Sequence, residues 1–306
     1  MNYPSAGSGH RKEVRKFINI WFPGAGLIAI VLFIFCSNVS AQKTLNYFDS
    51  FITDTLLKSS HLGVSVFDPA GNKFLHSYQS DKYFVPASNI KIITCYSALK
   101  YLPDSLSIDV RDTWWKDMGP GWAWTDDEEI ENVFPIVPFL DSGAIWSGKI
   151  DSLLRPMMFR SDNFLAEQLL RTLNKQVKFD TVDLFKEMPQ KPAWVDGCGL
   201  SRYNLFTPQH LVFILNKIYT EFGMNRIKTI FPSGNNGTLK NYYLAEKGSI
   251  YAKTGSLTGV LALSGYAYTR KNKLLIFSVL VNNHNSQPSV IRRRIEKFVK
   301  SLIAEN

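Results

Sequence analysis

Hydrophobic side chains recur at helical spacing through much of the chain. Residues 45–57 show this pattern, and a second helix is predicted to start near Ser88 and to end at Pro103. Further helical patterns lie at 150–158, 163–173 and 208–222. The middle of the chain is therefore predicted to be mostly helical.

Two regions of the chain predict β-strands. Residues 62–67 and 73–78 are rich in β-forming side chains, and the turn-forming sequence at 68–72 between them predicts a hairpin. The last third of the chain predicts three more strands, with a turn at 271–272 between the last two; these strands are 249–253, 260–268 and 274–281.

The final helix combines an apolar stripe with basic side chains. The stripe consists of Ile291, Ile295, Phe298, Val299 and Leu302, and arginines and lysines occupy the other faces. Such a helix can bind a membrane surface. Because it follows a run of strands, packing on a sheet is the favoured interpretation, and a peripheral membrane contact is the alternative.

This order of elements predicts an α/β (α+β) fold. The hairpin and the late strands can share one antiparallel sheet flanked by helices, while the helical block forms a second lobe. A cleft between the two is the expected position of an active site. Residues 105–145, which hold four tryptophans and an acidic run, are interpreted as a small irregular subdomain within the catalytic domain.

Composition excludes several classes of protein. With 45% hydrophobic and 20% charged residues, the chain is neither disordered nor a polytopic membrane protein. The formal net charge is +9, but no basic cluster is interleaved with aromatics, so nucleic acid is not expected as a partner. A modest positive charge suits an anionic cell-envelope substrate, although many soluble proteins share it.

The N-terminal residues resemble an export signal. Four basic residues at 11–16 precede an apolar run at 17–35. The sequence Val39-Ser40-Ala41 follows, with small residues at its last two positions, which is the pattern of a cleavage site. We expect a signal peptide at 1–41 and a periplasmic mature domain at 42–306. The alternative is an uncleaved segment that anchors the chain in the inner membrane.

Two cysteines lie outside the signal segment. An exported pair, Cys95 and Cys198, could form a disulfide. Because Cys95 falls on an apolar helical pattern, a buried free thiol is the simpler interpretation.

A Ser-x-x-Lys sequence at the start of a helix provides the first candidate chemistry. The i, i+3 spacing places Ser88 and Lys91 on one helical face, where a lysine of depressed pKa could activate a serine nucleophile. The same pattern occurs at Ser40, which cleavage would separate from its lysine, and at Ser97, which lies mid-helix. Ser88 is therefore the candidate nucleophile.

Two further short motifs follow along the chain. Ser161 and Asn163 flank Asp162 at a loop-to-helix junction, where all three residue types also favour helix capping. The sequence Lys253-Thr254-Gly255 is predicted to end a strand. Each motif alone is weak, but this set in this order is the one found in penicillin-binding proteins and class A β-lactamases.

At this point the chain resembles a known family, the class C low-molecular-mass penicillin-binding proteins, which are D-alanyl-D-alanine carboxypeptidase/endopeptidases. The segments that carry the resemblance are 86–91, 160–167, 196–202 and 236–239, with a fainter echo at 122–124. The family usually inserts extra domains between its first two motifs, but only residues 92–160 stand there in this chain. Cys198 also occupies a position where the family normally has serine.

The resemblance implies an acyl-transfer mechanism on peptidoglycan stem peptides, with β-lactams as inhibitors. Ser88 would attack the carbonyl between two D-alanines, and Lys91 would act as general base. Ser161 and Lys253 would relay the proton to the leaving amine, and Asn163 would hold Lys91 and the substrate amide.

The resemblance also implies the substrate contacts. Thr254 and Ser256 would bind the terminal carboxylate, and Gly255 would let the substrate backbone approach the strand. The backbone N–H groups of Ser88 and Ser256 would form an oxyanion hole. No metal or cofactor is expected, because the five histidines form no metal-binding motif.

Three alternatives remain open from the sequence. A serine β-lactamase and a serine esterase could use the same fold and the same first step. A non-catalytic wall-binding protein is the alternative from a different class.

Overall fold

The computed structural model describes residues 47–109, 145–177, 184–188 and 190–306, which belong to a compact unit spanning Asn46–Asn306. Five strands form one antiparallel sheet in the order β2-β1-β7-β6-β5. Their bounds are β1 His61–Asp68, β2 Lys73–Tyr78, β5 Ile250–Leu257, β6 Val260–Tyr268 and β7 Leu274–Asn282. The predicted hairpin and the late strands therefore do share a sheet.

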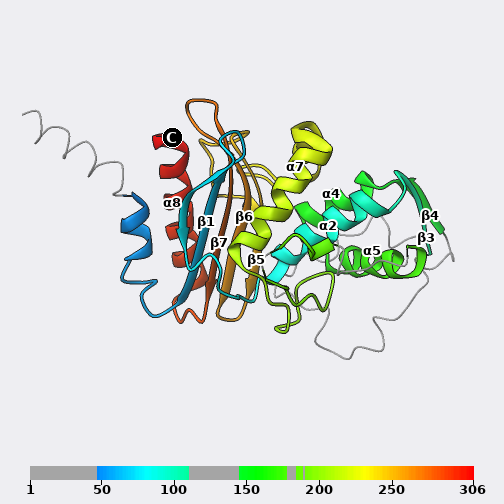
Figure 1. Cartoon of the computed structure of the whole chain (residues 1–306), viewed down its shortest axis with the longest axis horizontal. Helices are drawn as coiled ribbons and strands as arrows, with labels where there is room; N and C mark the ends of the chain where they lie inside the picture. Colours follow the sequence, from blue (N-terminus) through cyan, green and yellow to red (C-terminus); the bar gives the residue numbers. More distant parts are fainter. Residues whose placement is uncertain (1–46, 110–144, 178–183, 189) are drawn as a thin grey trace, which may run out of the picture. The chain divides into compact units, whose positions relative to one another are not determined.

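Helices cover both faces of this sheet (Figure 1). Helix α8, Pro288–Glu305, lies on one face and α7, Pro208–Ile230, lies on the other. Strands β6 and β7 are buried along almost their whole length because both of their faces are covered, which explains their continuous apolar sequence. The apolar stripe of α8 packs on the sheet, as predicted.

The remaining helices form the second lobe beyond α7 (Figure 1). A 3-10 turn, η1, at Ala87–Asn89 leads into α2, Ile90–Tyr101; α4 spans Asp151–Phe159 and α5 spans Asn163–Gln176. A second hydrophobic core joins these helices to α7 and the sheet. A two-stranded sheet, β3 Ser105–Asp109 and β4 Ile145–Lys149, lies at the far end of the lobe.

Three predicted boundaries differ from the structure. In the described part of the predicted helix 45–57, which begins at residue 47, the helix ends at residue 52. After it the Asp54 side chain accepts a hydrogen bond from Leu56 N in a turn. Helix α7 kinks at Gly223, next to its predicted end at Phe222, and then continues. Strand β5 runs four residues past its predicted end, so Lys253-Thr254-Gly255 lies inside the strand rather than at its end.

Several other predictions can be placed against the structure. Cys95 and Cys198 are both free and buried. The tryptophans and acidic run predicted as an irregular subdomain lie outside the described residues. Within the described part of the chain, no helix combines the length and the apolar character needed to cross a bilayer.

Candidate active site

Ser88 and Lys91 meet at the start of α2. Ser88 belongs to the 3-10 turn and is partly exposed, whereas Lys91 is fully buried one helical turn later. The distance between Lys91 Nζ and Ser88 Oγ is 3.1 Å. The sequence-predicted pair of nucleophile and base is therefore within hydrogen-bond reach.

Two more acceptors surround the Lys91 amine. Asn163 Oδ1 lies 2.7 Å from Nζ, and the backbone oxygen of Cys198 lies 2.8 Å from it. Burial lowers the pKa of Lys91 to about 8. Nearby ionisable groups act in the opposite direction and raise this pKa; they are Cys198, Asp162, Glu167 and Asp196. An appreciable fraction of this lysine is therefore neutral near pH 8 and can accept a proton.

A second lysine–serine pair lies beside the first. Lys253 Nζ, fully buried, donates to Ser161 Oγ at 2.8 Å and to the Thr254 carbonyl at 2.8 Å. Burial, followed by the positive charge of Lys91, holds the pKa of Lys253 well below its usual range. Two amines of depressed pKa therefore each lie within hydrogen-bond distance of a hydroxyl, the arrangement that proton transfer requires.

The second motif also caps a helix. The Asp162 side chain accepts a hydrogen bond from Leu165 N at 3.0 Å and begins α5. This cap fixes the first turn of α5, so that Ser161 and Asn163 reach the two lysines from one side. The motif therefore caps a helix through Asp162 and contacts the two lysines through Ser161 and Asn163.

Strand β5 carries the third motif along an edge of the sheet. Among the described strands, β5 pairs only with β6. On its other edge Tyr251 forms an isolated bridge with Ser233, and the part of this edge beyond Lys253 pairs with no described strand. Thr254 is partly exposed and Ser256 is exposed. These positions suit contacts to an extended substrate.

Gly255 packs closely against the turn that bears Ser88. A β-carbon at this position would stand 2.8 Å from the Pro86 carbonyl oxygen and 3.1 Å from Asn89 Nδ2. The chain's own η1 turn occupies this space, and the approach of a substrate backbone to the strand stays a prediction. The glycine allows close packing between β5 and the turn that bears Ser88, and Asn89 Nδ2 also donates to the Lys253 carbonyl at 2.9 Å.

One charged residue at this edge was missed by sequence reasoning. Arg292 Nη2 donates to Ser256 Oγ at 3.2 Å. Its neighbours Arg293 and Arg294 pair with Glu296 and Asp54, whereas Arg292 forms no ion pair with any described residue. Only the packing of α8 beside β5 distinguishes it from the other basic residues of the helix.

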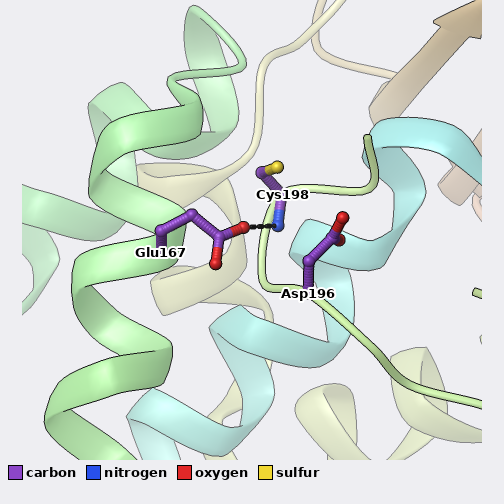
Figure 2. Close-up of side chains that lie close together, drawn as sticks. All are labelled: Glu167, Asp196 and Cys198. Carbon is purple, nitrogen blue, oxygen red and sulfur yellow. Dashed lines mark hydrogen bonds between the residues drawn. The ribbon is translucent and has the colours of Figure 1, made fainter. Parts of the chain in front are cut away.

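Glu167, Asp196 and Cys198 form a buried cluster (Figure 2), and the backbone oxygen of Cys198 is one of the acceptors of Lys91. Their potential ligand atoms lie within 4.8 Å of one another. Backbone donors occupy the carboxylates: Cys198 N donates to Glu167 at 2.7 Å, and Gly199 N and Ser201 N donate to Asp196 at 2.6 Å each. The cluster serves to hold a turn of the backbone, and the predicted independence from metal stays a prediction.

A family model agrees with this geometry. The model for the D-Ala-D-Ala carboxypeptidase 3 (S13) family matches residues 45–111 and 144–302. The chain belongs to the S13 family. This confirms the resemblance that was read from the motifs, and the unmatched gap falls within residues 92–160, the short segment that stands where the family usually inserts extra domains.

Curated relatives of this S13 chain are similar over part of their length. Penicillin-sensitive carboxypeptidase A of Dictyostelium discoideum is 28% identical over 181 residues, which cover 52% of this chain and 35% of the relative. Carboxypeptidase DacB of Mycolicibacterium smegmatis is 31% identical over 160 residues, covering 45% and 35%. The chain thus spans about a third of the length of these relatives.

Solved structures share the fold of this S13 chain. Penicillin-binding protein 4 of Haemophilus influenzae matches with a TM-score of 0.65 at 16% identity, covering 84% of this chain and 98% of that one. TLA-1 extended-spectrum β-lactamase matches with a TM-score of 0.63 at 16% identity, covering 86% and 97%. The predicted fold class is confirmed.

Proposed function

We propose that this chain is a serine D-alanyl-D-alanine carboxypeptidase/endopeptidase that cleaves peptidoglycan stem peptides through an acyl-enzyme on Ser88. The observation that carries the proposal is the contact of Lys91 Nζ with Ser88 Oγ beside the Lys253–Ser161 pair. Family membership supports the same reaction.

The reaction follows from the two pairs. Neutral Lys91 takes the Ser88 proton while Ser88 Oγ forms a bond to the carbonyl carbon between two D-alanines. The carbon–nitrogen bond then breaks, and the leaving amine receives a proton through Ser161 and Lys253. Water hydrolyses the resulting ester and regenerates Ser88.

The edge strand provides the binding surface in this proposal. The substrate lies extended along β5, and the backbone N–H groups of Ser88 and Ser256 stabilise the oxyanion. Thr254 and Ser256 bind the terminal carboxylate, with Arg292 beside them. A carboxylate-bearing substrate suits this positively charged edge.

Penicillins would acylate the same serine in place of the peptide. The carboxypeptidase of Dictyostelium discoideum is named penicillin-sensitive, and penicillin-binding protein 4 of Haemophilus influenzae has been solved with a β-lactam. We also propose that the protein acts in the periplasm after export by the 1–41 segment, because its substrate lies in the cell wall.

Labelling with a fluorescent penicillin tests the proposal. We expect stoichiometric, stable labelling of the wild type, loss of labelling in Ser88→Ala, and normal labelling in Ser97→Ala. Ser97 is the matched control because it begins another Ser-x-x-Lys sequence, is fully buried, and has a hydroxyl group that makes no hydrogen bond with any described residue.

The other outcomes contradict the proposal in different ways. Label that disappears within seconds would indicate a β-lactamase. Folded wild type that takes no label would favour an esterase or a wall-binding protein. Release of D-alanine from pentapeptides, compared with cleavage of cross-linked dimers, then separates carboxypeptidase from endopeptidase activity.

A further inference from the structure

The direction of the Lys91 lone pair depends on its two fixed acceptors. A neutral amine has two N–H bonds and one lone pair. When Asn163 Oδ1 and the Cys198 carbonyl accept the two N–H bonds, the lone pair is left facing the Ser88 hydroxyl. The Cys198 carbonyl is therefore one of the two acceptors that set the direction of the Lys91 lone pair.

The turn at 196–199 places this carbonyl, and three side chains hold the turn. Thr94 Oγ1, from α2, donates to the Gly197 carbonyl at 2.7 Å. Asp196 accepts from Gly199 N, within the turn itself. Glu167, from α5, accepts from Cys198 N at 2.7 Å, on the residue whose carbonyl contacts Lys91 (Figure 2).

Helix α5 therefore reaches Lys91 by two routes. Asn163 and Glu167 are four residues apart and share one helical face. Asn163 contacts the amine directly, and Glu167 contacts the residue that provides the other acceptor. Glu167 is only 8% exposed, so its carboxylate has few alternative positions.

We propose that Glu167 is a positioning residue for the general base: its hydrogen bond to Cys198 N sets the carbonyl that, together with Asn163, aims the Lys91 lone pair at Ser88. This inference rests on the proposed function, because it takes Lys91 as the base. Glu167 touches neither the substrate nor the reacting atoms.

Two substitutions separate the hydrogen bond from the charge. Glu167→Gln keeps an acceptor oxygen at the same reach and removes the charge. Glu167→Asp keeps the charge and withdraws the carboxylate by about 1.5 Å, the length of one carbon–carbon bond. Stopped-flow labelling with a fluorescent penicillin measures the acylation rate constant and the non-covalent dissociation constant separately.

We expect Glu167→Asp to lower the acylation rate constant at least about tenfold, because a displacement of about 1 Å can cost up to a hundredfold. Glu167→Gln should stay within about threefold of wild type when measured above about pH 9, where Lys91 is neutral whether or not the Glu167 charge raises its pKa. The dissociation constant should not change in either variant, since the interaction matters only when the proton moves.

Glu296→Asp is the matched control. Glu296 is also a buried helical glutamate that accepts from a loop N–H, at 2.9 Å from Tyr243 N. We expect this variant to lose thermal stability and keep its acylation rate constant.

Three results would each overturn the inference. The first is a wild-type acylation rate constant in Glu167→Asp, and the second is an equal loss of that rate constant in Glu167→Asp and Glu167→Gln. The third is a change in the dissociation constant alone. Wild type that is not acylated would instead overturn the proposed function, and the inference with it.

Discussion

Gly199 lies directly against Ala87, the residue before the nucleophile. A β-carbon at residue 199 would overlap the Ala87 carbonyl oxygen and stand 2.9 Å from Ser88 N. Gly199 has a φ of +92° and Ala87 has a φ of +49°, so both adopt backbone conformations that side chains disfavour. The turn that orients Lys91 and the turn that bears Ser88 are thus packed together without an intervening side chain.

This contact predicts that Gly199→Ala displaces the nucleophile. We expect at least about a tenfold loss of penicillin acylation, together with about 1–3 kcal/mol of lost stability. Gly248→Ala is the control, because Gly248 has a φ of +84° and nothing within 4 Å of its β-carbon position. Equal behaviour of the two variants in labelling assays would contradict the prediction.

Acylation should depend on pH through Lys91. The base must be neutral, and burial lowers its pKa to about 8, so the rate should rise through about pH 8 and level off above it. Because Lys91 and Lys253 interact, the observed value belongs to the pair. The measurement is the second-order acylation rate constant from pH 6 to 10, and a flat profile would exclude Lys91 as the base.

Asp162→Asn should move that profile to lower pH. The Asp162 charge raises the pKa of Lys91, and asparagine removes the charge while it remains a good helix N-cap. The thermal unfolding temperature checks that α5 still forms. A shift to higher pH would show that the sign of this interaction is wrong.

Arg292 should discriminate between carboxylates and amides. A charge-assisted hydrogen bond is worth about 1.5–3 kcal/mol, so Arg292→Gln should lower kcat/KM about tenfold or more for a peptide ending in free D-alanine. The corresponding C-terminal amide should be unaffected. Arg293→Gln is the control because Arg293 pairs with Glu296 and stacks on Tyr242. Equal losses on both substrates would argue against carboxylate recognition.

His210 should make stability depend on pH. Burial lowers its pKa to about 4, so the unfolded chain takes up a proton first, and stability falls as pH drops from 6.5 towards 4. The full loss is about 3 kcal/mol. His210→Gln preserves the capping box with Thr207. The free energy of unfolding of this variant, measured in urea, should fall less than that of the wild type between about pH 7 and about pH 4.5. Parallel falls in wild type and variant would exclude His210 as the cause.

The sequence was sufficient to predict an element or a motif where the local residue pattern and the packing in the fold agree. Residues 260–268 alternate too little to show which face is buried, yet their apolar run predicts the bounds of β6 correctly because both faces are covered. The motifs that contain Ser88, Asn163 and Lys253 could be found because each needs specific residue types at fixed spacing. The structure brings all three together.

Other features depend on contacts between distant segments. Strand β5 continues beyond Lys253 because it stays paired with β6 as far as Leu257, whereas glycine locally favours a strand end. Arg292 differs from Arg293 and Arg294 only in what α8 places beside it. The acceptor at Cys198 is a backbone atom, which no side-chain pattern can indicate.

The pairing of β3 with β4 fixes both ends of the segment that connects these two strands. Asp109 and Ile145 face each other in the register, so the chain leaves and returns at points about 5 Å apart. The S13 family model is interrupted at nearly the same two points. Because loop closure costs little more for a long segment than for a short one, evolution can lengthen or shorten this connection without remodelling the catalytic lobe. The β3–β4 pair therefore fixes both ends of this connection, so that a change in its length need not move the catalytic residues.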